Sequence, residues 1–324
     1  MKIKLLGKNE FELWDRFVAS SSNGTIFNKS FWLNSSGAPF DIWGAFQGDN
    51  LVGGFVVSYR KLLSRKIAAP PHLTPYSGIV FPNYKGKYVG KITSEKELIK
   101  EAAELIRKEY GMGVLSFDPS AVDLQPFLWQ GYKVRLHYTY ILNISSLGEA
   151  WKNMAAEKRN DIRKAENDGL KVRASNSFDE LILLVKKTFN RQGLEPSWEG
   201  IAGNYYRTLS DRSLCKGFVC IDGKGTSIAA ALIIWDEKRA YYLLGGYDGG
   251  AKHHGASSLC LWAAIKYAAE ELGIKVFDFE GSSIPQVERS FRKFGGTLTP
   301  YYEVRWGRML DTVLMLNRIF KKAW

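Results

Sequence analysis

The sequence has few cysteines, few histidines and no long hydrophobic run. Its three cysteines, Cys215, Cys220 and Cys260, are too few and odd in number for a disulfide framework, which favours a reducing compartment. The four histidines form no zinc-type spacing with the cysteines, so we expect no metal site. The longest uncharged apolar stretches, 226–235 and 253–265, fall short of the roughly 20 residues that a membrane-spanning helix needs.

The N-terminal segment also lacks the apolar core of a secretory signal, because charged residues return every few positions. We therefore expect a cytoplasmic protein without a transmembrane segment. With 324 residues, of which 45% are hydrophobic, the chain is long enough for about two globular domains. Lys and Arg (45) outnumber Asp and Glu (33), and the net charge of +12 favours a phosphate-bearing partner such as a nucleotide, RNA or anionic lipid.

The two halves of the chain share an order of sequence elements. Each half has an apolar helical pattern, a hairpin pattern, a helix closed by glycine and a further strand. These segments are 11–17, 43–57, 102–111 and 114–118 in the first half, and 178–185, 218–234, 263–273 and 276–280 in the second. The repeat predicts an α/β fold of two halves, each a mixed β-sheet flanked by helices. Alternatively, the turn and helix-end residues common to unrelated α/β segments would produce part of the same pattern.

The halves differ where the central helix begins. In the first half, Ser94 and Glu97 match a capping box, which would satisfy the free N–H groups of that helix from within the chain. In the second half, the corresponding segment 247–257 contains small residues, which let the backbone approach a ligand, together with basic side chains. Because a helix N-terminus is positive, this segment predicts a phosphate site; a flexible surface turn with a serine N-cap is the alternative.

The spacing of Lys252, Gly255 and Ala256 resembles the pyrophosphate loop of the GNAT acyltransferase superfamily, although that loop usually starts with Gln or Arg and ends with Gly. Over essentially the whole chain, further segments resemble the Fem-type branch of that superfamily: 157–170, 277–282 and 291–296, with 24–27, Ser30 and Trp32. The resemblance implies two tandem GNAT-like domains, 1–145 and 146–324, the second with a basic helical insertion at 150–173.

The resemblance also implies an acyl-CoA donor, such as acetyl-CoA. The residues that would bind it are Lys252, His253, His254, Gly255, Ala256 and Ser257. The Fem-type branch includes enzymes that add amino acids from aminoacyl-tRNA to peptidoglycan precursors, alongside acyl-CoA N-acyltransferases. Peptidoglycan-bridge members typically carry a lysine where this chain has Phe291, and the coiled-coil arm of some members has no counterpart, since no segment here sustains heptads. Both differences weaken the aminoacyl-tRNA alternative.

Transfer of an acyl group to nitrogen requires a base for the attacking amine. Glu280, at the end of the strand 276–279, is our candidate, because flanking aromatic residues would raise its pKa by desolvation. Alternatively, Asp278 and Glu280 share a strand face and pair with neighbouring cations. Tyr247 and Asp248 are expected to orient the acceptor amine, although an ordinary Asp-Gly-Gly turn explains that segment more simply.

The acceptor side is expected in the insertion, where Arg159 and Arg163 share one helix face able to bind an anionic acceptor such as a sugar nucleotide. Interleaved acidic residues make a merely solvated, self-paired helix the alternative. Trp198 is expected to present an exposed ring in a loop beside the acceptor. The complete set of expected acceptor-binding residues is Arg159, Asn160, Arg163, Lys164, Trp198, Asp278, Arg292 and Lys293.

Near the C-terminus an amphipathic pattern precedes Lys321 and Lys322. Its apolar positions, which suit packing on the body of the protein or shallow membrane contact, are Met309, Val313, Leu316 and Phe320.

Three functional hypotheses follow. The first is a cytoplasmic N-acyltransferase that uses acyl-CoA and an amine acceptor such as a cell-envelope or sugar-nucleotide precursor. The second is a Fem-type aminoacyltransferase that uses aminoacyl-tRNA. The third is a non-catalytic RNA- or membrane-surface-binding protein, for which the basic charge is necessary but not diagnostic. The acyl group, the acceptor and the oligomeric state are left open by the sequence.

Overall fold

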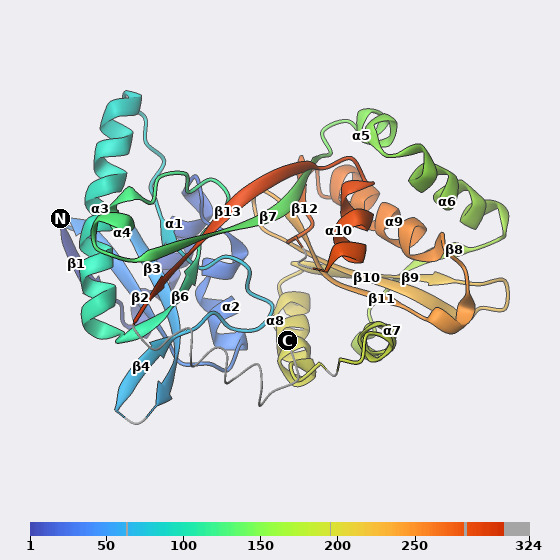
Figure 1. Ribbon diagram of the computed structural model, residues 1–324, viewed down its shortest axis with the longest axis horizontal. Coiled ribbons are helices and arrows are strands. Elements are labelled where there is room, and N and C mark those ends of the chain that lie inside the picture. Colours follow the sequence, from blue (N-terminus) through green and yellow to red (C-terminus); the bar gives the residue numbers. More distant parts are fainter. Residues whose placement is uncertain (63, 195, 282–283, 308–324) are drawn as a thin grey trace. The chain divides into compact units, whose positions relative to one another are not determined.

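The computed structural model describes residues 1–62, 64–194, 196–281 and 284–307, which form two compact units (Figure 1). Unit 1 consists of residues 1–137 and 300–307, and unit 2 of residues 138–299. The amphipathic positions Met309, Val313, Leu316 and Phe320 lie outside the described residues. None of the helices in the described ranges combines the length and the apolar composition that crossing a bilayer requires.

Unit 1 has a mixed sheet in the order β1-β2-β3-β4-β6-β13, with β5 paired to β3 and with β13 (Thr297–Trp306) contributed from late in the chain. Its helices and strands are β1 (Lys2–Leu5), α1 (Phe11–Ser20), α2 (Ser30–Ser35), β2 (Phe40–Gln47), β3 (Asn50–Leu62), β4 (Arg65–Ala68), β5 (Ile79–Val80), α3 (Tyr88–Glu109), β6 (Met112–Ser116) and α4 (Gln125–Trp129), with short 3-10 helices η1 (Lys8–Glu10) and η2 (Ile26–Asn28). The predicted helix at 11–17 and hairpin at 43–57 are present as α1 and as β2 with β3.

The central helix of unit 1 begins earlier than the sequence predicted. The α3 helix starts at Tyr88, so Ser94 and Glu97 lie inside it and the predicted capping box is wrong. No glycine or proline separates Lys91 from Ser94, and the helix therefore extends toward its N-terminus until Lys87, which has extended backbone angles. Its buried residues recur at helical spacing and pack on the sheet: Leu98, Ile99, Ala102, Ala103 and Ile106.

Unit 2 has a mixed sheet in the order β7-β12-β11-β10-β9-β8. Its helices and strands are α5 (Leu147–Asn153), α6 (Ala156–Asn167), β8 (Lys171–Ser175), α7 (Phe178–Arg191), α8 (Glu199–Asp211), β9 (Cys215–Ile221), β10 (Ser227–Trp235), β11 (Ala240–Tyr247), η3 (Gly249–Ala251), α9 (Ala256–Glu270), β12 (Val276–Asp278) and α10 (Pro285–Arg292). The expected hairpin at 218–234, helix at 263–273 and strand from 276 are all present.

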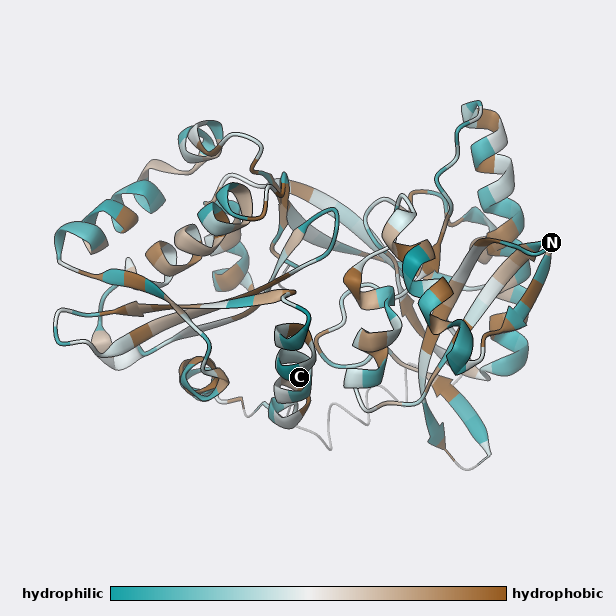
Figure 2. Ribbon diagram, turned by 180° about the vertical axis from the view of Figure 1, so that it is seen from behind, coloured by the Kyte–Doolittle hydropathy of each residue, from teal (hydrophilic) through white to brown (hydrophobic). Residues whose placement is uncertain are grey.

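The α9 helix is the central helix of unit 2. Nine of its fifteen residues are buried, and it packs against β9, β10 and α6. The α6 helix is largely hydrophilic (Figure 2) and buries only Lys158, Ile162 and Ala165, at spacings of four and three residues. On α7, the backbone of Leu184 lies so close to β11 that a Cβ at Gly246 would be 2.5 Å from the Leu184 carbonyl carbon. These contacts fix the strand–helix pair β11–α9 that carries the predicted phosphate site.

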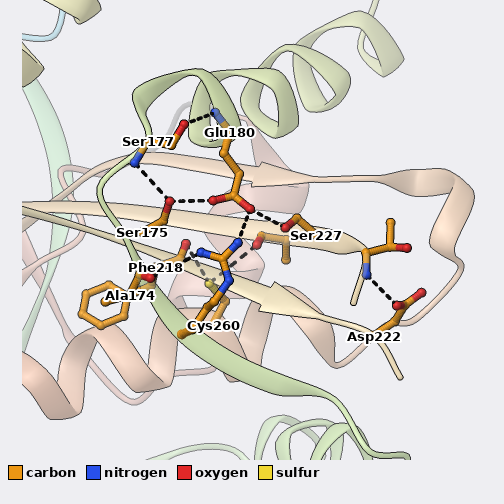
Figure 3. A network of polar contacts seen from close by, with 11 residues as sticks. Ala174, Ser175, Ser177, Glu180, Phe218, Asp222, Ser227 and Cys260 are labelled. Atoms are coloured by element: carbon orange, nitrogen blue, oxygen red, sulfur yellow. Dashed lines mark hydrogen bonds and ion pairs between the residues drawn. The ribbon is translucent and has the colours of Figure 1, made fainter. Parts of the chain in front are cut away.

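A polar network ties the start of α7 to the sheet of unit 2 (Figure 3). The Glu180 carboxylate accepts hydrogen bonds of 2.6 Å from Ser175 on β8 and from Ser227 on β10, and it forms a 2.6 Å ion pair with Arg173. Ser177 caps α7 by accepting a hydrogen bond from the Glu180 backbone N–H. Burial opposes ionisation of Glu180, but the hydrogen bonds from Ser175, Ser227 and Arg173 outweigh it and lower the pKa of this carboxyl.

The two units exchange their last strands. The strand β7 (Lys133–Asn143) ends the first repeat, yet its residues 141–143 pair with β12 of unit 2. The strand β13 (Thr297–Trp306) ends the second repeat, yet its residues 303–306 pair with β6 of unit 1. The compact units consequently change at 137/138 and again at 299/300, whereas the sequence predicted one boundary at 145/146.

Candidate functional site

Two neighbouring parallel strands of unit 2 part soon after they meet. Within the described residues, β11 and β12 pair only through Ala240 with Phe277 and Tyr241 with Asp278. The strand β11 then continues to Tyr247, paired on its other side with β10, while Phe279 donates its backbone N–H to the Tyr140 carbonyl of β7. The backbone groups of residues 242–247 that face away from β10 are thus not bonded to β12, at the carboxyl ends of the strands, where ligands of α/β sheets bind.

Glu280 lies where β11 and β12 part. Its backbone has a φ of +58°, an uncommon conformation for a residue other than glycine, and its N–H donates to Asp278 Oδ1 at 2.8 Å. The side-chain Oε1 is buried and has no hydrogen-bond partner among the described residues. Burial, and secondarily the nearby Asp278 carboxylate, raises the pKa of Glu280 well above 4.5. This environment is suited to a carboxyl group that takes up a proton more readily than an exposed glutamate does.

Asp278, unlike Glu280, is a hydrogen-bonded carboxylate that supports the fold. Its side chain is fully buried, accepts a 2.6 Å hydrogen bond from Thr139 Oγ1, and lies 3.6 Å from Arg239. The carboxylate therefore holds the backbone of Glu280 and the neighbouring strands in place. Because no part of its side chain is exposed, the expectation that Asp278 binds the acceptor directly is wrong.

The end of β11 and the turn that follows it carry Tyr247, Asp248 and Lys252, which are all expected site residues. Asp248 caps η3 by accepting from the Gly250 N–H at 2.9 Å, and its other oxygen lies 2.6 Å from Lys187; these two interactions, Lys187 first, lower its pKa. The guanidinium of Arg191 lies over the Tyr247 ring, 5.5 Å from the centroid of that ring. Lys252 is exposed, in the left-handed region at a φ of +52°. The Asp-Gly-Gly turn thus places Lys252 beside the first turn of α9.

The start of α9 is closed only in part. The Gly255 N–H donates to His253 Nδ1 at 3.2 Å, and His253 Nε2 lies 3.1 Å from Asp168 at the end of α6. His254 is exposed, whereas Gly255 and Ala256 are buried and Ser257 is partly buried. No side chain of the described residues caps the helix. Packing also requires glycine at position 255, since a Cβ there would be 2.2 Å from the Asp161 carbonyl oxygen of α6.

The four expected cations and amides of α6 divide into two groups. Arg159 is used within the fold: its guanidinium donates to the carbonyls of Trp151 and Lys152, at 3.2 and 2.7 Å, and to that of Met154, at the end of α5. Asn160, Arg163 and Lys164 are exposed. Arg163 lies over the Trp151 ring, and Lys164 pairs with Asp168 at 2.8 Å. The exposed face remains available to an anionic acceptor.

The other expected acceptor residues are spread over unit 2. Trp198 precedes α8, is only 6% exposed and packs edge-on against Phe189, so the expectation of an exposed ring is wrong: the apolar indole completes the packing of α7 against α8. Arg292 is exposed and pairs with Glu288. Lys293 pairs with Glu157 of α6 at 2.5 Å, and its backbone carbonyl accepts from Ala155. Lys293 therefore joins the end of α10 to α6, whereas the Arg292–Glu288 pair lies within α10.

Lys158 is a buried cation beside the start of α9 that the sequence did not single out. It is 8% exposed, and its Nζ donates to Ser258 in the first turn of α9 at 2.9 Å and to Ser290 of α10 at 3.5 Å. The signal was present: Lys158 precedes Ile162 by four residues and Ala165 by seven, so it shares their buried helix face.

Comparisons with known proteins identify the class of fold. Residues 152–285, which include α6, α9 and Glu280, match the acetyltransferase (GNAT) domain family. No curated protein sequence is significantly similar to the chain. The matched residues make up most of unit 2, which therefore has a GNAT-like fold.

Solved structures extend this result to the whole chain. FemX matches 93% of this chain with 97% of its own, at a TM-score of 0.72 and 14% identity. A tandem GNAT protein from the clavulanic acid biosynthesis pathway matches 94% with 97% of its own, at a TM-score of 0.56 and 12% identity. The C-terminal domain of a putative lysylphosphatidylglycerol synthetase from Agrobacterium fabrum matches 95% with 95% of its own, at 0.61 and 14%. The chain therefore has a tandem GNAT-like fold, similar to the folds of FemX and of the tandem GNAT protein, as the sequence resemblance implied.

Proposed function

We propose that this protein is an N-acyltransferase that moves an acyl group from acyl-CoA to an amine, with the active site in unit 2. The observation that carries the proposal is the parting of β11 and β12 with Glu280 at the point where they separate. A buried carboxyl with a raised pKa is the group that amine activation needs, and it lies within the segment that matches the GNAT family. The family match supports an acyltransferase; the choice of donor and acceptor is our inference.

The donor would lie along β11 and its phosphates at the start of α9. The backbone groups of 242–246 that β12 leaves unpaired can bind the amides of the pantetheine arm, whereas those of Tyr247 are bonded to Thr188. The uncapped first turn of α9 and the exposed Lys252 and His254 favour a pyrophosphate at that end. Gly255, Ala256 and Ser257 keep this part of the backbone free of bulky side chains.

In the reaction, the Glu280 carboxylate accepts one proton from the attacking amine. The carbon–nitrogen bond forms as the carbon–sulfur bond breaks. The departing thiolate takes up a proton from solvent to leave as free thiol, and Glu280 releases the proton that it accepted to solvent. Tyr247 and Asp248, at the end of β11, are proposed to help orient the amine. The exposed Asn160, Arg163 and Lys164 are proposed to bind an anionic acceptor, such as a cell-envelope or sugar-nucleotide precursor in the cytoplasm.

A second candidate is transfer from aminoacyl-tRNA. The net charge of +12 and the match to FemX along 93% of the chain favour it. Phe291, at the position of the lysine typical of peptidoglycan-bridge enzymes, counts against it: its ring is buried, stacked on Phe279, and supplies no charge.

Calorimetry with CoA, acetyl-CoA, and charged and uncharged tRNA tests the proposal. We expect CoA binding that Lys252→Ala weakens, since this exposed lysine lies beside the first turn of α9. The matched control is Lys224→Ala, which removes another exposed turn lysine in the β9–β10 hairpin. An absence of CoA binding at millimolar concentration, together with preferential binding of charged tRNA, would overturn the first candidate in favour of the second.

A further inference from the structure

We infer that Lys158 is the buried cation that binds a phosphate of the donor from beneath the first turn of α9. This inference rests on the proposed function, because it names a further residue of the same donor site. It assigns a ligand-binding role to a side chain that the mechanism above does not use.

The position of Lys158 is set by three elements of unit 2. From α6, its Nζ reaches Ser258 Oγ of α9 at 2.9 Å and Ser290 Oγ of α10 at 3.5 Å, and it lies 5.5 Å from the centroid of the Phe294 ring. The close approach of α6 to α9 at Gly255 is what brings the ammonium to the helix start. Lys158 is thus enclosed, in contrast to the exposed Lys164 six residues later.

Within the described part of the chain, the charge of Lys158 has one counter-ion, Asp161, and that ion pair is long. Its hydrogen-bond partners are neutral hydroxyl groups, and the nearest carboxylate oxygen, of the partly exposed Asp161, is 4.0 Å away. Glu157 is engaged by Lys293. Burial lowers the pKa of Lys158, the positive charge of Lys293 acts in the same direction, and Asp161 and Glu157 oppose both. A buried ammonium without a close anion is costly, and an anionic ligand would remove that cost.

A phosphate fits this position better than a carboxylate of the protein does. Ser258 is the third residue of α9, whose first turn has no side-chain cap. Its hydroxyl accepts from Lys158, so its own proton is available to a phosphate oxygen. The backbone N–H groups of the same turn and the helix dipole attract the same charge. Lys158 and the start of α9 therefore converge on one anion.

The test compares Lys158→Met with Lys171→Met, which removes an exposed lysine of the adjacent strand β8. Calorimetry with CoA, pantetheine and inorganic pyrophosphate measures ligand affinity, and thermal unfolding without ligand measures stability. We expect Lys158→Met to weaken CoA and pyrophosphate binding at least tenfold, to leave pantetheine binding unchanged, and to keep or raise the unfolding temperature. A purely structural lysine would instead lower that temperature and affect all three ligands alike.

The outcomes separate this inference from the proposed function. If wild type binds CoA and Lys158→Met binds it equally well, the inference is overturned and the proposed function stands. If wild type binds pyrophosphate through Lys158 but does not bind CoA, the phosphate site stands and the donor is not CoA. Should Lys158→Met fail to fold, Ser258→Ala decides, because it removes only a hydroxyl: weaker pyrophosphate binding supports the inference, and unchanged binding overturns it.

Discussion

At the scale of single residues, two glutamates of unit 2 show how environment decides the role of one side chain. Glu180 receives hydrogen bonds from two serines and an arginine, and its pKa is lowered. Glu280 has a buried oxygen without a partner among the described residues, and its pKa is raised. The first is held ionised as part of the fold, whereas the second is poised to take up or release a proton.

Replacing Glu280 by glutamine tests its proposed role as a base. We expect Glu280→Gln to reduce kcat/KM by about 100-fold or more, because an amide cannot accept the proton of the amine. Wild-type kcat/KM should rise with pH through the raised pKa of Glu280, and the variant should lose that limb of the profile. The measurement is initial rate against pH, with the exposed Glu270→Gln of α9 as the matched control.

The same substitution has a defined effect on stability. Since the folded pKa of Glu280 lies above its unfolded value, its contribution to stability is present below the unfolded pKa and is lost as pH rises through the folded pKa. Glu280→Gln should therefore unfold at a higher temperature than wild type above neutral pH, and this advantage should disappear near pH 4. A variant that is less stable at high pH would contradict the buried, uncompensated state of this carboxyl.

The sequence predicted some of these residues and misassigned others, for physical reasons. Glu280 was predicted because its position at a strand end follows from local pattern, and its catalytic role stays a prediction. Trp198 was expected in solvent because its neighbours Pro196 and Ser197 are typical of loops. Its ring is instead packed against Phe189, and a pattern of adjacent residues does not predict that contact. Arg159 is a residue type that often binds anionic ligands. Its guanidinium instead donates to carbonyls at the end of α5, a contact that depends on the folded positions of the two helices.

At the scale of elements, the start of α7 depends on the Glu180 network shown in Figure 3. The three side chains that hold Glu180 come from β8 and β10, so the carboxylate joins the helix to two strands. The Ser177 cap acts on the same turn. Hydrogen bonds and an ion pair therefore hold the start of α7 in place, in addition to apolar packing.

We expect Glu180→Gln to destabilise the protein by about 1–3 kcal/mol at neutral pH, the usual range for hydrogen bonds to a charged group. The folded pKa of Glu180 is lowered, so its contribution is present above the unfolded pKa and is lost as pH falls through the folded pKa. The difference between wild type and variant should shrink in acid. Urea unfolding at pH 7 and pH 3.5 measures it, and equal differences at both pH values would refute the charged-network explanation.

Among the elements, hairpins and amphipathic helices were predicted well because turn residues and periodicity are local properties. The start of α3 was not, since a capping-box match inside a longer helical pattern does not end the helix. The sequence also could not predict which sheet each final strand joins, because β7 and β13 have the same apolar alternation in either sheet.

At the scale of the whole molecule, the net charge of +12 predicts salt-sensitive binding of any polyanion. Binding of tRNA at low salt would therefore not by itself establish tRNA as the donor. We expect tRNA affinity to fall about 1000-fold or more between about 50 and 200 mM salt if six or more phosphates are contacted, and CoA affinity to fall much less. An RNA hairpin of unrelated sequence is the control, and tRNA binding that persists at high salt and discriminates charged from uncharged tRNA would favour the second candidate.

The exchange of final strands has a consequence for the order in which the chain folds. Unit 1 needs residues 303–306, whose Val304 and Trp306 are buried in its core and whose Trp306 indole donates to the Tyr110 carbonyl. These residues leave the ribosome after the whole of unit 2. An N-terminal domain ordinarily folds first during synthesis, but here β6 must keep an unpaired edge until translation has reached Trp306. The nascent protein thus carries an aggregation-prone strand edge for most of its synthesis, and unit 2 is the half that can fold first.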